Sequence, residues 1–164
     1  MRVNMKLIAI ILSFMIGIFT VSCGEPSKRS SDAADDSTAE DVTEVSQMKI
    51  DIEAGGTHLT ASFADSTAAK ELAEKLKAEP VTVTLNEYGG FEKVGKLPWP
   101  LTRTDASTET GPGDIMLYQG DQMTIFYNSN SWSYTKLGHI DNITQEELKA
   151  ILGESDITVT LSLK

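Results

Sequence analysis

The sequence has few of the residues that build common metal and nucleic-acid sites. Cys23 is the only cysteine in 164 residues, which excludes an intrachain disulfide and any zinc or iron–sulfur site that needs several thiolates. The two histidines, His58 and His139, fall in separate predicted elements, and we expect no metal site. Basic residues are scarce, since 14 Lys and Arg stand against 24 Asp and Glu. This acidic balance repels phosphate backbones and predicts no nucleic-acid partner.

The length and composition predict one globular domain with appendages. Hydrophobic residues make up 40% of the chain and charged residues 23%, which is close to the average of soluble proteins. The strings Gly89-Gly90 and Gly111-Pro112-Gly113 are not followed by a helical pattern, so neither has the context of a phosphate-binding loop. We therefore expect no bound cofactor.

Residues 1–22 have the composition of a secretory signal. Arg2 and Lys6 precede Leu7–Val21, a run without charged residues. At about 1.5 Å per residue this run covers about 23 Å, which is short of the roughly 30 Å hydrocarbon core of a bilayer. The pattern therefore favours a signal peptide over a permanent transmembrane helix.

The residues around Cys23 resemble a bacterial lipobox. Ser22 is a small residue directly before the only cysteine, although Thr20 stands where leucine is usual. The resemblance implies cleavage before Cys23 and acylation of its thiol, which would anchor the protein in the bacterial cell envelope, outside the cytoplasm, without spanning the membrane. The alternative is an ordinary secreted protein with one free cysteine.

Residues 23–47 are predicted to be an acidic, flexible tether. The stretch 25–46 is mainly Ser, Asp, Glu, Ala and Thr, with seven acidic and two basic residues. It has almost no large apolar side chain whose burial could offset the entropy of ordering, and its like charges favour an extended chain. A calcium loop is the alternative for such acids, but the stretch contains no glycine to form the turn.

Residues 48–164 show strand periodicity that helical periodicity interrupts twice. Apolar and polar residues alternate around 48–64, 81–88, 115–127 and 157–163, and Gly55-Gly56 predicts a hairpin turn in the first run. Helical spacing occurs at 67–78 and 144–152. We expect a turn-rich crossing at 91–100 and a polar loop at 103–114. The pattern predicts a mainly β fold, a closed barrel with two short helices that cap its open ends.

Several strings in this part resemble the bacterial cyclophilin-like domain family. They are Tyr88–Gly95 (YGGFEKVG), Leu97-Pro98, Gly113–Ile115 with Leu117-Tyr118, Ile125–Tyr127 and Asn130–Gly138 (NSWSYTKLG). The resemblance covers essentially all of 48–164 and implies an eight-stranded cyclophilin-like barrel closed by helices. The resemblance is a much safer guide to the fold than to the function, because the biochemical role of the family is largely undefined and one fold hosts many functions.

Aromatic residues gather near residue 130 and indicate a ligand-binding groove. Four of them lie within nine positions, beside Asn128 and Asn130, and aromatic rings with a few polar groups line ordinary peptide and small-molecule sites. The candidate groove residues are Tyr88, Glu92, Arg103, Phe126, Asn130, Trp132 and Tyr134.

Several of these residues also have a purely structural interpretation. Phe126 and Tyr127 can instead be core residues of a strand, and we favour this interpretation for both. Trp132 and Tyr134 lie in a loop-like polar stretch, and packing is as good an explanation for them as ligand contact. Glu92 follows a Gly-Gly turn with Lys93, so the two can form a solvated turn pair.

Prolyl isomerisation is the activity that the resemblance raises first. In true cyclophilins an arginine early in the barrel donates a hydrogen bond to the prolyl nitrogen, which weakens the amide resonance behind a rotation barrier of roughly 18–20 kcal/mol. The corresponding strand, 81–88, contains no arginine, and Arg103 is the only arginine of 48–164. We therefore interpret the protein as a module that binds a peptide segment or small ligand and has no catalytic residues, with peptidyl-prolyl isomerase as the alternative.

Overall fold

The computed structural model describes Val45 and residues 47–164. The predicted signal peptide, Cys23 and all of the predicted tether except Val45 and Gln47 lie outside the described residues. Within the described part, no helix is both long enough and apolar enough to cross a membrane.

The described chain is mainly β, as predicted. Most strands along residues 49–163 follow one another directly, and helices stand only between β2 and β3 and between β8 and β9. In chain order they are β1 (Lys49–Ala54), β2 (Thr57–Phe63), α2 (Thr67–Ala78), β3 (Val81–Tyr88), β4 (Glu92–Lys96), β5 (Ala106–Thr110), β6 (Asp114–Tyr118), β7 (Gln122–Phe126), β8 (Asn130–Ile140), α3 (Gln145–Leu152) and β9 (Ile157–Leu163).

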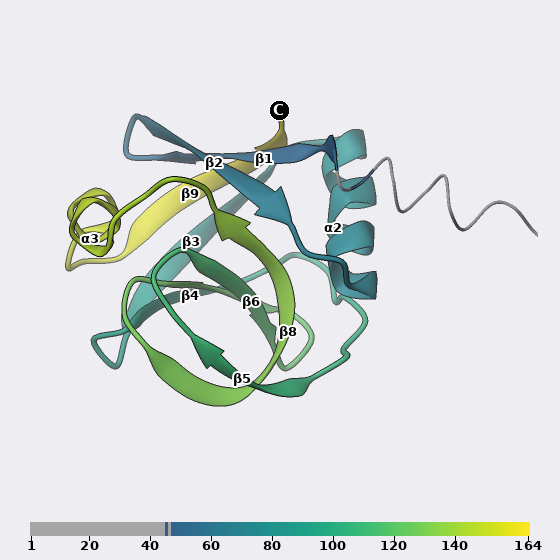
Figure 1. Cartoon of the computed structure of the whole chain (residues 1–164). Coiled ribbons are helices and arrows are strands. Elements are labelled where there is room, and N and C mark those ends of the chain that lie inside the picture. The colour runs from purple at the N-terminus through teal and green to yellow at the C-terminus, as the bar shows by residue number, and fades with distance from the viewer. Residues whose placement is uncertain (1–44, 46) are drawn as a thin grey trace, which may run out of the picture. The chain divides into compact units, whose positions relative to one another are not determined.

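The strands form one sheet that closes on itself. Its order is β2-β1-β9-β3-β4-β7-β6-β8-β5, and β2 also pairs with β8, which joins the two sides of the sheet into a ring. Strand β5 pairs antiparallel with the first half of β8, at Asn130–Tyr134. Figure 1 shows β8 as the long curved strand that runs from β5 to the β1–β2 hairpin.

The two helices complete the main hydrophobic core, and both were predicted. Helix α2 begins at the N-cap Ser66, whose side chain accepts a hydrogen bond from the Ala69 N–H, and it buries Leu72 among the strand residues. Helix α3 begins with a capping box between Thr144 and Glu147 and buries Leu148 and Leu152. Figure 1 shows α3 at the left and α2 at the right of the closed sheet, and both helices pack against the same core.

Three segments that were predicted as loops are strands instead. The turn-rich crossing at 91–100 contains β4, the polar loop at 103–114 contains β5, and the polar stretch before Tyr134 begins β8. Strand β5 has no apolar alternation because four of its five residues are exposed or half-buried, so backbone pairing with β8 holds it. Strand β4 carries charged residues at buried positions, which conceals the alternation from the sequence.

Closure of the ring depends on a close approach at Gly138, which pairs with Phe63 of β2. A Cβ atom at Gly138 would stand 2.5 Å from the Ser62 carbonyl oxygen. We expect Gly138→Ala to lower the free energy of unfolding by roughly 1–3 kcal/mol in urea denaturation, because the added methyl group forces the strands apart. Gly111→Ala is the matched control, since its Cβ would meet nothing within 4 Å. Equal effects of the two changes would contradict this account of the closure.

Candidate functional site

Three neighbouring strands, β7, β6 and β8, bury apolar residues on both faces. Ile125 of β7 belongs to the main core, whereas the next residue, Phe126, belongs to a second cluster with Met116 and Tyr134. Since successive side chains of a strand point to opposite faces, this second cluster lies on the other face of the sheet from the main core. Phe91 and Tyr118 pack against its edge.

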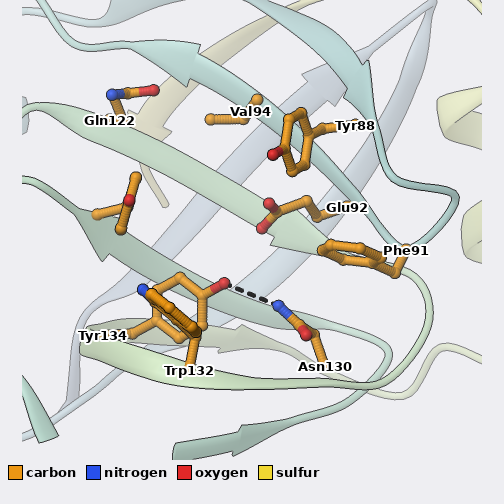
Figure 2. Close-up of a pocket in the computed structure, with 9 residues that line it drawn as sticks. Tyr88, Phe91, Glu92, Val94, Gln122, Asn130, Trp132 and Tyr134 are labelled. Atoms are coloured by element: carbon orange, nitrogen blue, oxygen red, sulfur yellow. Dashed lines mark hydrogen bonds between the residues drawn. The ribbon is translucent and has the colours of Figure 1, made fainter. Parts of the chain in front are cut away.

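A pocket of about 370 Å³ lies over this second cluster, within the range of about 300–1,000 Å³ that is usual for small-molecule sites. Figure 2 shows its side chains, which come from β3, β4, β6, β7 and β8 and the turn before β4. The lining residues are Tyr88, Phe91, Glu92, Val94, Tyr118, Gln122, Asn130, Trp132 and Tyr134.

The structure brings five of the seven predicted groove residues together in this pocket. These five residues are Tyr88, Glu92, Asn130, Trp132 and Tyr134. The sequence reasoning missed Phe91, Val94, Tyr118 and Gln122. A usable signal existed for two of them, because Tyr118 and Gln122 alternate with the core residues Leu117 and Met123 and so had to face the other side of the sheet.

The remaining two candidates do not line the pocket. Phe126 is fully buried beneath it, with its ring stacked on Phe91 at 6.3 Å and edge-on to Tyr134 at 5.4 Å. The core interpretation of Phe126 is therefore confirmed. Arg103 lies elsewhere, where its Nε donates a 3.0 Å hydrogen bond to Asp105.

The aromatic walls are open to solvent. Tyr88 and Trp132 are 60% and 61% exposed, and they are the exposed large hydrophobic residues of the described chain. Tyr88 meets Phe91 edge-on at 6.0 Å. Deeper in the pocket the Asn130 side-chain amide donates a 3.0 Å hydrogen bond to the Tyr134 hydroxyl, drawn dashed in Figure 2.

Glu92 places a carboxyl group at the centre of the pocket (Figure 2). It is the first residue of β4, pairs with Phe126 of β7 and is only 5% exposed. Its Oε2 atom and the nearby Thr124 hydroxyl have no hydrogen-bond partner within the described structure. Such an unsatisfied buried polar group ordinarily costs about 1–3 kcal/mol, so its position requires an explanation.

Burial also changes the acidity of Glu92. Removal from water raises the pKa of its carboxyl to about 7, the nearby charge of Glu87 adds to the rise, and the Thr124 hydroxyl opposes it. The carboxyl therefore changes its charge near neutral pH. A strongly shifted carboxyl in a pocket is a candidate functional group, able to bind a donor or to exchange a proton.

Lys93, the next residue, is buried in a different way. It points to the opposite face, is fully buried, lies 3.0 Å from Glu87 Oε2 and donates a 2.7 Å hydrogen bond to the Ser155 carbonyl. Although burial acts to raise the pKa of Glu87, hydrogen bonds from Tyr127 and Lys93 hold it below its usual value. The solvated turn pair proposed for Glu92 and Lys93 is thus wrong.

The arrangement suits binding of a ligand by aromatic contact and one acidic acceptor. None of the nine lining residues is Lys, Arg or His. Across the described residues, no group of three or more His, Cys, Asp or Glu side chains could hold a metal ion. The chemistry available in the pocket is therefore that of Glu92, the tyrosine hydroxyls and the amides.

The buried carboxyl should make stability depend on pH. Because its folded-state pKa of about 7 exceeds the ordinary 4.5, the stability that protonated Glu92 provides is present below about pH 4.5 and is lost as pH rises through about 7. Relative to Glu92→Gln, the unmodified chain should lose about 3 kcal/mol of unfolding free energy between about pH 4 and about pH 8, as measured by urea denaturation. Glu154→Gln, at an exposed loop position, is the control. A difference that stays constant with pH would contradict the raised pKa.

Comparison with known proteins places the chain in a family. The model of the cyclophilin-like family matches residues 52–162. A solved structure of similar fold is the solution structure of a hypothetical protein from Archaeoglobus fulgidus, with a TM-score of 0.54 and 15% identity over 71% of this chain and 95% of that chain. The comparison with curated proteins found no match. The chain therefore belongs to the cyclophilin-like family.

Proposed function

We propose that the protein is a lipid-anchored binding module of the bacterial cell envelope, which holds a peptide segment or a small ligand in its aromatic pocket, outside the cytoplasm. The observation that carries the binding function is the pocket itself, where exposed Trp132 and Tyr88 flank the buried carboxyl of Glu92. Large apolar side chains exposed beside convergent polar groups are typical of binding sites.

The size and shape of the pocket suit a side chain or a short segment. Its floor is preformed, because Phe126 and Tyr134 pack against each other beneath it and Asn130 fixes the Tyr134 hydroxyl. A rigid floor lowers the entropic cost of binding, and aromatic rings supply large contact areas with few rotatable bonds.

Isomerase activity has less support from the same geometry. The cyclophilin mechanism needs a guanidinium that donates to the prolyl nitrogen, and the pocket contains no arginine. Arg103, the only arginine of the folded part, is paired with Asp105 outside the pocket. We therefore propose binding without turnover as the function of this site.

The contribution of Trp132 can be measured directly. We expect a screen of peptides and metabolites by calorimetry to give ligands whose affinity falls about tenfold or more in Trp132→Ala, since a large exposed ring in a contact site is a typical hot spot. Trp99→Phe is the control, because Trp99 packs against the main core and Lys75 and does not line the pocket. Hits that Trp132→Ala binds as tightly as the unmodified chain would exclude this pocket.

The lipid anchor is supported by the sequence alone, through Ser22-Cys23 and the preceding uncharged run. Expressed in a bacterium, the mature protein should begin at an acylated Cys23, which mass spectrometry of the N-terminal peptide will detect. Cys23→Ser should leave the protein without acyl chains and shift it out of the membrane fraction. A mature N-terminus at another residue would contradict the anchor.

A further inference from the structure

The carboxyl of Glu92 has an acceptor oxygen that no hydrogen-bond donor of the described structure satisfies. Its Oε2 is buried and has no partner within the described structure, and the carboxyl points into the pocket (Figure 2). Buried polar atoms of folded proteins nearly always have a partner. Lys93, the nearest basic residue in sequence, cannot provide one, because it lies on the opposite face and is held by Glu87 and Ser155.

The surroundings of Glu92 favour a positively charged donor. The pocket has one acidic side chain and no basic one. Its walls are the rings of Tyr88, Phe91, Tyr118, Trp132 and Tyr134, and the faces of aromatic rings attract cations through their quadrupoles. An anionic ligand would meet the Glu92 carboxylate without a counter-charge in the pocket, and would be repelled.

We propose that the pocket binds an ammonium group on an aliphatic chain, with the ammonium donating to Glu92 and the methylenes lying against the aromatic rings. This inference rests on the proposed binding function and names the ligand chemistry of the same site. A lysine side chain of a peptide and a free aliphatic amine both present this chemistry. Asn130 and Tyr88 also line the pocket, and their side-chain oxygens can accept hydrogen bonds from further N–H groups.

Binding of a cation should be linked to the ionisation of Glu92. The other ionisable groups around it are Glu87 and Tyr88 of β3, Tyr118 of β6, Tyr127 after β7 and Tyr134 of β8. The pKa of Glu87 is lowered and those of Tyr127 and Tyr134 are raised, and phenols ordinarily titrate near pH 10. Glu92, with its pKa of about 7, is thus the group whose charge changes around neutral pH. Cation affinity should rise with pH through this range, whereas affinity for a neutral ligand should not.

The test uses the full chain in micelles of an uncharged maltoside detergent, which brings no competing cation, and two matched pairs of probes. N-acetyl-lysine methylamide is compared with N-acetyl-norleucine methylamide, which lacks the ammonium, and cadaverine is compared with pentane-1,5-diol. Calorimetry at about pH 8 should give each cation an affinity at least about tenfold higher than its neutral partner, and the cation affinity should fall about tenfold at about pH 6. The stronger of the two cations identifies the peptide or the free amine as the source.

Variants separate the role of Glu92 from general charge effects. Glu92→Gln should remove the preference for cations and its pH dependence, and Glu154→Gln, which removes the same charge at an exposed position, should leave both unchanged. The pH series on the unmodified chain needs no variant, so the test holds even if Glu92→Gln does not fold. Equal affinity for cations and neutral partners, or no saturable cation binding, would overturn the inference. Trp132-dependent binding of other ligands would then still support the binding function.

Discussion

The structure depends on the burial of two consecutive charged residues on opposite faces of one strand. Strand alternation sends Glu92 to the pocket face and Lys93 to the core side, and pairing of β4 with both β3 and β7 prevents either from moving out to water. Lys93 is compensated by Glu87 and the Ser155 carbonyl. Within the described residues Glu92 has no ion-pair partner, and its Oε2 accepts no hydrogen bond. The fold thus stabilises one charge and leaves the other available to a ligand.

The pocket follows from a sheet that is apolar on both faces. The β2–β8 pairing closes the sheet, and the main core lies on one of its faces. Side chains of the strands and of the two helices make up this core. Strands β6 and β7 still bury Met116 and Phe126 on the other face. This second cluster supplies a rigid floor, and the residues around it supply the rings and the carboxyl of the site. A ligand can therefore bind without any rearrangement of the main core.

Local patterns were enough to predict much of the fold. Gly55-Gly56, the Thr144 capping box and the alternation of β9 each specify their element within a few residues, and the structure confirms them. The patterns failed where partners distant in sequence decide the structure. The sequence of β4 shows no strand alternation because Glu92 and Lys93 are charged although both are buried. The sequence of β5 shows none because its residues are mostly exposed or half-buried. Their pairing with β7 and β8 spans a separation that periodicity does not reveal.

The sequence predicted the pocket residues Trp132 and Tyr134 of the aromatic cluster, and also Tyr88 and Glu92, but it missed others that the fold brings to them. Trp132 and Tyr134 lie close together along the chain, whereas Phe91 and Tyr118 join them only through the packing of β4, β6 and β8. The burial of Glu92 could not be predicted from the sequence, because a Gly-Gly turn before it and the charged Lys93 after it are typical of an exposed turn.

The ionisation of Glu92 is the central claim, because the binding chemistry of the pocket depends on it. The most direct measurement is a carbon-13 NMR titration of the Glu92 side-chain carboxyl in the ligand-free protein, assigned with Glu92→Gln. The account predicts a midpoint of about 7. A midpoint near 4.5, the ordinary value for glutamate, would show a carboxyl that is solvated or already paired, and would contradict the account.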